Sequence, residues 1–151
     1  QYYNYDEKMI QCFKNRWLEE IEMPERLKLD KPFSGVSYFL EKRSKYQDLF
    51  LITARQHPSS VEQQINQFGW RGLFKGIFVT RQIATKAETI NASFSPNRSD
   101  ILIGDTGEDV IAAKTLGIRA FAVASGFLDA DILEEYEPDR VLNSVIDLPD
   151  D

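Results

Sequence analysis

Short apolar runs alternate with stretches of helical character from residue 48 onward. The apolar runs, each expected to form a buried strand, occupy residues 48–55, 76–80, 100–106, 119–125 and 140–143. The helical stretches between them occupy residues 58–68, 84–93, 107–116 and 129–135. Near-continuous apolar strands are typical of parallel strands that are buried on both faces, and crossover helices supply the cover. The pattern therefore predicts an α/β fold: a parallel sheet with helices on both faces.

The N-terminal part of the chain has a different pattern. Apolar residues recur at three- and four-residue steps within residues 5–29, which predicts an amphipathic helix that Pro24 interrupts. A further helix is expected after Pro32, with Ser34 as its cap. We therefore divide the chain into a helical segment, residues 1–32, and an α/β unit, residues 33–151.

Composition excludes several classes of protein. Hydrophobic residues make up 42% and charged residues 28% of the 151 residues, which is typical of a globular domain. The net charge of −6 offers no basic surface, so we expect no nucleic-acid or membrane partner. Cys12 is the only cysteine, which excludes an intramolecular disulfide and favours a cytoplasmic location. No apolar run is long enough to cross a membrane, so we expect a soluble protein.

The clearest chemical signal is the run ILIGDTGEDV at residues 101–110. Ligands of parallel α/β sheets bind beyond the carboxyl ends of the strands, and Asp105 leaves a predicted strand at that edge. Gly104 permits a close approach of the backbone, and Asp109 falls in the first turn of the next helix. Two carboxylates that converge are stabilised by a cation, and oxygen ligands suit Mg²⁺. The alternative interpretation is a turn followed by a helix cap, without any metal.

Two weaker signals accompany this run. Thr53 ends the first predicted strand, where its hydroxyl and the next backbone amide, that of Ala54, can bind a phosphoryl oxygen. The alternative is that Thr53 only caps the following helix. Lys86 can neutralise charge on a transferring phosphoryl group, although an exposed lysine is usually only solvated. Arg55 and His57, which follow the same strand, are expected to be surface loop residues.

The order of these signals resembles motifs two, three and four of the haloacid dehalogenase superfamily. The resemblance covers roughly residues 33–147, and GDTGEDVIAAKTLGIRAFAVASGF is similar to the phosphoglycolate-phosphatase-like branch. It implies a Rossmann-like core and a Mg²⁺-dependent phosphatase that acts on a small phosphorylated metabolite through an aspartyl-phosphate. It also implies that Thr53, Ala54 and Lys86 bind the phosphate. Asp105 would ligate the metal, and Asp109 would ligate it through water or orient Lys86.

The chain departs from the family pattern at its start. The family nucleophile is the first aspartate of an Asp-x-Asp pair at the end of an N-terminal strand, and the sequence contains no such pair before Asp48. Residues 5–29 instead resemble the end of the helical cap that many members insert after that strand. We therefore expect a fragment that lacks the nucleophilic aspartate and the first strand of the core. The alternative is a non-catalytic binding or regulatory module that recruits a partner, including a second copy in a homodimer, through residues 1–30.

A second departure concerns the lysine. The interval of 19 positions between Lys86 and Asp105 is short for the branch that the chain otherwise resembles. Lys75, Arg81 and Lys114 therefore stay open as weaker candidates for the cationic role.

Overall fold

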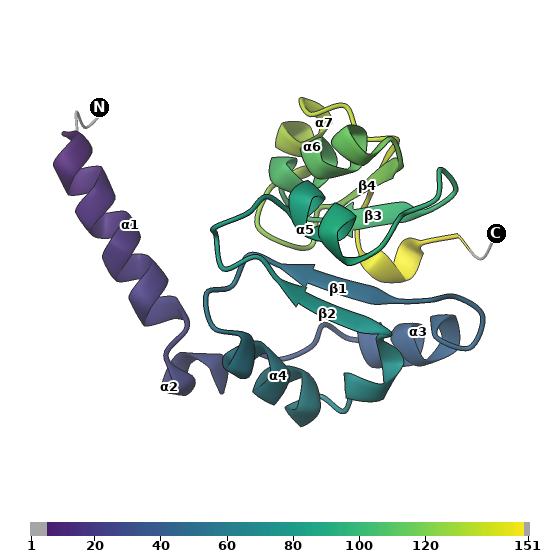
Figure 1. The fold of residues 1–151 in the computed structure, drawn as a ribbon, viewed down its shortest axis with the longest axis horizontal. Helices are drawn as coiled ribbons and strands as arrows, with labels where there is room; N and C mark the ends of the chain where they lie inside the picture. Colours follow the sequence, from purple (N-terminus) through teal and green to yellow (C-terminus); the bar gives the residue numbers. More distant parts are fainter. Residues whose placement is uncertain (1–5, 150–151) are drawn as a thin grey trace.

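The computed structural model describes residues 6–149 and contains the alternating elements that the sequence predicts. Their order is α1 (Glu7–Ile21), α2 (Pro24–Leu27), α3 (Val36–Arg43), β1 (Phe50–Thr53), α4 (Pro58–Gln67), η1 (Arg71–Leu73), β2 (Gly76–Val79), α5 (Lys86–Ser93), β3 (Ile101–Gly104), α6 (Gly107–Leu116), β4 (Arg119–Val123), α7 (Ala130–Glu134), β5 (Arg140–Leu142) and η2 (Val145–Asp147). The predicted α/β class is confirmed (Figure 1).

All strand pairs are parallel, but the sheet is divided into two parts. β1 pairs with β2, so that Thr53 lies opposite Val79 at the end of both strands. β3, β4 and β5 form the second part in that order, with Gly104 opposite Ala122. Within residues 6–149, β1 and β3 each pair on one edge only, and their other edges have no strand partner. Figure 1 shows the two parts lying on either side of the gap between β1 and β3.

Two helices connect the parts of the sheet. α6 packs on β3 and β4, whereas α5 packs on β1 and β2 and also against α6. Phe94, the C-cap of α5, stacks on Phe50 of β1 with ring centroids 4.2 Å apart and lies 5.9 Å from Phe78 of β2. Stacked aromatic pairs stabilise packing beyond the area they bury, so these contacts help to hold α5 on β1 and β2.

The main core lies beneath α6, around β3 and β4. Its fully or nearly fully buried members are Val110, Ala113, Ala120, Ala122 and Leu133. Small residues on α6 and β4 let this helix lie close to the sheet, because an alanine side chain fills little space between two backbones. The first turn of α6, which carries Asp109, is therefore held firmly next to the end of β3.

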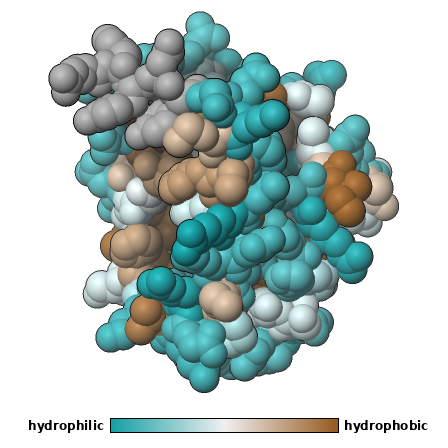
Figure 2. Space-filling model, turned by 90° about the vertical axis from the view of Figure 1, so that its left-hand side faces the viewer, coloured by the Kyte–Doolittle hydropathy of each residue, from teal (hydrophilic) through white to brown (hydrophobic). Residues whose placement is uncertain are grey.

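The predicted N-terminal helix is confirmed, but its apolar residues are exposed. Asp6 caps α1 by accepting a hydrogen bond of 2.7 Å from the Met9 amide, and the helix ends before Pro24. Phe13 is 72% and Trp17 46% exposed. α1 projects away from the two sheets in Figure 1, and Figure 2 shows apolar surface among polar surface on that side of the molecule. No helix in residues 6–149 is both long and apolar enough to span a membrane.

The predicted cap of the following helix is wrong by one residue. Gly35, and not Ser34, is the N-cap residue of α3, and it has a φ angle of +82°. This left-handed conformation costs little for glycine and considerably more for a residue with a side chain. The chain therefore turns into α3 through backbone geometry, without a side-chain cap.

Candidate functional site

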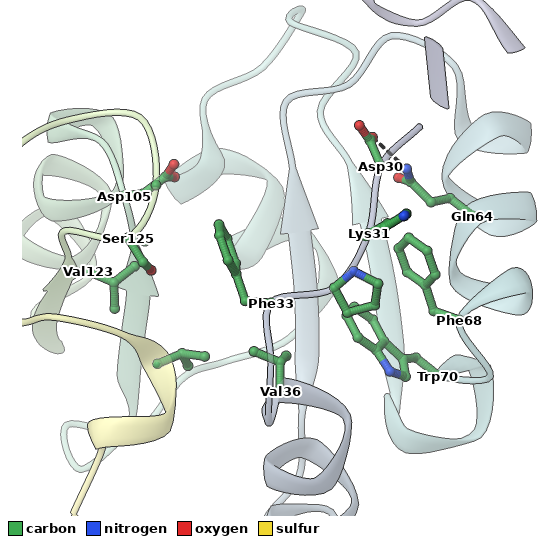
Figure 3. Close-up of a pocket in the computed structure, with 14 residues that line it drawn as sticks. Asp30, Lys31, Phe33, Val36, Gln64, Phe68, Trp70, Asp105, Val123 and Ser125 are labelled. Carbon is green, nitrogen blue, oxygen red and sulfur yellow. Dashed lines mark hydrogen bonds between the residues drawn. The ribbon is translucent and has the colours of Figure 1, made fainter. Parts of the chain in front are cut away.

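A cavity of about 430 Å³ lies between the two parts of the sheet. One wall carries Gly104, Asp105, Val123, Ser125, Gly126 and Val145, and the other carries Asp30, Lys31, Pro32, Phe33, Val36, Gln64, Phe68 and Trp70. Figure 3 shows Asp105 on one side, Gln64 and Trp70 on the other, and Phe33 between them. The segment that enters the α/β unit thus lies in the gap, where Phe33 is still 63% exposed.

Asp105 follows β3 directly and faces this cavity, as the sequence predicts. One of its oxygens accepts a hydrogen bond of 2.8 Å from the Phe127 amide. The turn that supplies this amide lies so close that a Cβ added to Gly126 would be 2.1 Å from the same carboxylate oxygen. Glycine at position 126 is therefore required for the turn to approach and orient Asp105. The other oxygen of the Asp105 carboxylate can still accept a hydrogen bond or bind a cation from the cavity.

Asp109 has different partners from Asp105. The Asp109 side chain is 6% exposed and forms an ion pair with Lys86, whose side chain is 15% exposed. The second oxygen accepts hydrogen bonds from the Thr106 amide at 3.2 Å and from the Thr106 hydroxyl at 2.7 Å. These contacts form a capping box at the start of α6. Both oxygens of Asp109 are thus engaged, which favours the orientation of Lys86 over direct metal binding.

Lys86 is held in place at the start of α5. It is the first residue of α5, which Thr85 and Glu88 cap reciprocally, and hydrogen bonds from Thr85 lower the pKa of the Glu88 carboxyl. The other three candidate cations lie elsewhere. Lys75 pairs with Asp48 at 2.5 Å, Lys114 donates to the Tyr136 carbonyl at 2.7 Å, and Arg81 is exposed. Of the four candidates, Lys86 is the one that contacts the Asp109 carboxylate.

Thr53 and Ala54 lie at the end of β1, across the gap from β3. The Thr53 hydroxyl accepts a hydrogen bond of 3.4 Å from the Arg55 amide, which is a local turn contact. Thr53 does not cap the following helix, because His57 is the N-cap residue of α4. Among the described residues, the cavity lining includes Asp105 but not Thr53, Ala54, Lys86 or Asp109. The structure therefore joins Lys86 to Asp109, and it leaves Thr53 on the opposite part of the sheet.

The loop after β1 has two acidic partners that the sequence analysis missed. The carboxylate of Glu22 accepts from the amides of Gln56 and His57, and Asp30 pairs with Arg55 at 3.3 Å. No local motif reveals these contacts, because the partners are more than 20 residues apart in the sequence. The Thr106–Asp109 capping box, by contrast, follows the Ser/Thr-x-x-Asp/Glu pattern and could have been found.

The residues that could bind Mg²⁺ supply only part of a ligand set. Within residues 6–149, no group of three or more histidine, cysteine or acidic side chains is placed to hold a metal ion. Asp105 alone combines a carboxylate with a position on the cavity wall at the end of β3. A hard cation with oxygen ligands fits this carboxylate, provided that water, substrate or another protein group completes the shell.

Gly104 is expected to be intolerant of substitution. A Cβ at this position would lie 2.0 Å from Cγ of Asp109, so Gly104→Ala should displace the Asp109 side chain and destabilise the protein by about 1–3 kcal/mol. Gly72→Ala is the matched control, because a Cβ added to Gly72 would have nothing within 4 Å and no strain is expected. Urea unfolding of both variants measures the difference. Equal stabilities for the two variants would contradict the close packing of Asp109 on β3.

Comparison with known proteins identifies the family and the fold. The model of the haloacid dehalogenase-like hydrolase family matches residues 1–123. The pyrophosphatase PpaX of Halalkalibacterium halodurans is 29% identical over 63 residues, which is 42% of this chain and 29% of that protein. The chain thus spans less than a third of the length of this curated relative.

Two solved structures share the fold. A predicted phosphatase from Clostridium acetobutylicum superposes with a TM-score of 0.74 and 24% identity, covering 95% of this chain and 69% of the other. A haloacid dehalogenase-like family hydrolase from Streptococcus pneumoniae gives a TM-score of 0.71 at 22% identity, covering 91% of this chain and 65% of the other. Since the family model matches most of the residues, the chain belongs to the haloacid dehalogenase-like hydrolase family.

Proposed function

We propose that this chain is the larger part of a Mg²⁺-dependent phosphatase that hydrolyses a small phosphorylated metabolite in the cytoplasm. One observation carries the proposal: the buried Lys86–Asp109 pair lies beside Gly104 and Asp105, where the family places its phosphate- and metal-binding groups. A lysine held at the carboxyl ends of parallel strands is suited to neutralise an anionic substrate. The phosphatase and pyrophosphatase relatives support a phosphate ester or anhydride as the substrate class.

The division of labour among the residues follows from their contacts. Asp105 would ligate the metal through its cavity-facing oxygen, and bound Mg²⁺ would neutralise the negative charge of the phosphate. Asp109 would hold Lys86 and reach the metal only through water. Lys86 would contact the phosphate from the start of α5, and Thr53 with the Ala54 amide would contact it from the end of β1. Phosphoryl transfer depends mainly on such positioning and charge neutralisation.

The attacking group in this proposal comes from outside the described residues. The unpaired edges of β1 and β3 face the same gap, and a parallel strand placed there would complete a single sheet. An aspartate at the end of that strand would lie between Thr53 and Asp105 and attack phosphorus, which gives an aspartyl-phosphate that water then hydrolyses. We accordingly propose that residues 33–151 are a core without its first strand and that residues 1–32 are the remnant of a cap.

Magnesium binding tests the metal site directly. We expect weak binding of Mg²⁺ by the chain and a loss of about tenfold or more in affinity for Asp105→Asn, since even outer-shell groups contribute that much to metal sites. Asp131→Asn, on the exposed surface of α7, is the control and should bind like the unmodified chain. Isothermal titration calorimetry measures all three proteins. Indistinguishable binding by Asp105→Asn and the unmodified chain would refute the role of Asp105.

A further inference from the structure

Glu22 is a buried carboxylate that the proposed chemistry does not use. It is the C-cap residue of α1 and is 6% exposed. Its two oxygens accept hydrogen bonds from the Gln56 amide at 2.7 Å and the His57 amide at 3.1 Å. Burial of a carboxylate is costly unless both oxygens are hydrogen-bonded, and here backbone amides satisfy both. Such an arrangement is a fixed contact between two distant parts of the chain.

The partners of Glu22 belong to the segment that joins the candidate phosphate-binding backbone to α4. This segment, residues 54–57, begins directly after Thr53 and ends where Pro58 opens α4. The negative charge of Glu22 therefore lies at the amino end of a ten-residue helix, where the helix dipole favours it. Glu22 does not cap the helix, because the amides that it holds precede Pro58, but it fixes the backbone that leads into α4.

A second contact fixes the same segment. Asp30 accepts hydrogen bonds from the Arg55 guanidinium at 3.3 Å and from the Gln64 side-chain amide of α4 at 2.7 Å. Residues 54–57 are thus held by three groups: the Glu22 carboxylate, the Asp30 carboxylate and the Thr53 hydroxyl, which accepts a hydrogen bond from the Arg55 amide. Of these contacts, those of Glu22 are the most buried, and they are made to the main chain, whose direction they determine directly.

We propose that Glu22 is a positioning residue for phosphate binding at the end of β1. By holding the Gln56 and His57 amides, it fixes the backbone of residues 54–57 and hence the direction of the Ala54 amide. Because Glu22 ends α1, the same contact ties the base of the N-terminal helix to this backbone. The effect on phosphate binding rests on the proposed function. The contact of Glu22 with the Gln56 and His57 amides does not, and it can be tested separately.

Hydrogen exchange and phosphate titration of the isotope-labelled chain, both followed by NMR, test the proposal. Glu22→Gln retains the size of the side chain but replaces one acceptor oxygen by an NH₂ group. One of the two backbone amides then faces another donor and loses its hydrogen bond. We expect exchange at Gln56 and His57 to become about tenfold faster or more, as the loss of a charge-assisted hydrogen bond predicts. The apparent Kd for inorganic phosphate, read from the Ala54 amide shift, should rise severalfold. Glu22→Asp keeps both acceptor oxygens and should recover part of both effects.

Glu20→Gln is the matched control, two residues earlier on α1. Glu20 accepts a hydrogen bond from Arg16 at 2.8 Å on the exposed side of the helix, so this variant should leave exchange and phosphate affinity unchanged. Unchanged exchange at Gln56 and His57 in Glu22→Gln would overturn the proposal. So would faster exchange throughout the chain, because that would mean a general structural role. If the unmodified chain binds no phosphate, the proposed function fails, and the exchange data alone decide whether Glu22 fixes this backbone.

Discussion

Replacing Lys86 by methionine should lower the free energy of unfolding by about 3–5 kcal/mol, the usual cost of removing one partner from a buried ion pair. The physical reason is the carboxylate left behind: Asp109 is 6% exposed and would lose the cation that compensates its charge. Thr106 would continue to donate to one oxygen, but a neutral donor does not replace the charge. Chemical denaturation, with the midpoint and slope both fitted, measures the change.

Lys75→Met is the matched control for this measurement. Lys75 pairs with Asp48 at the surface, where the two side chains are 62% and 58% exposed, so its loss should cost no more than about 1 kcal/mol. The double variant Lys86→Met with Asp109→Leu should be more stable than Lys86→Met alone, because it removes the uncompensated charge. Similar losses for Lys86→Met and Lys75→Met would show that the Lys86–Asp109 pair is not a buried pair in solution.

The chain of 151 residues should show no enzymatic hydrolysis of p-nitrophenyl phosphate with Mg²⁺ present. Its rate should lie about six orders of magnitude below that of an enzyme with its nucleophile, the loss seen when a catalytic nucleophile is removed. Two carboxylates line the cavity, those of Asp30 and Asp105. Asp30 contacts Arg55 and Gln64, and the proposed mechanism uses Asp105 to hold the metal, so neither takes the role that the family gives to an aspartate on a central strand.

Mass spectrometry of the assayed sample serves as the control, since a co-purified peptide could fill the gap between β1 and β3. Asp30→Asn and Asp105→Asn distinguish the remaining possibilities. Mg²⁺-dependent turnover by a verified single chain, abolished by Asp30→Asn, would contradict the proposal that the nucleophile comes from another strand. Phosphate binding without turnover in every form of the protein, including one with an aspartate-bearing strand in the gap, would favour the non-catalytic binding module instead.

The elements and strand ends could be predicted from sequence because their signals are local. The apolar run before Thr53 and the run before Asp105 each form a short parallel strand, and Gly117 ends α6 in the left-handed conformation that its position predicts. The ion pair with Asp109, which favours Lys86 over its three rivals, could not be predicted from sequence, since it joins residues 23 positions apart. The contacts of Glu22 and Asp30 were missed for the same reason.

The apolar face of α1 illustrates a different limit. Periodicity indicates which residues share one side of a helix, but it does not show what covers that side. An amphipathic pattern predicts that Phe13 and Trp17 face a neighbouring element, and in residues 6–149 they are largely exposed. The burial of a helix face depends on tertiary neighbours, which a pattern within the helix does not contain.

The order of the strands has a consequence for how the chain folds. β1 pairs with β2, β3 with β4, and β4 with β5, so every ladder joins strands that follow one another in the sequence. Each pairing closes one loop of moderate length, which limits the chain entropy that is lost in forming it. Topologies with such short sequence separations fold faster than those built on distant pairings. We therefore expect strand pairing to begin within each part of the sheet separately, and the contacts between α5 and α6 to join the two parts afterwards.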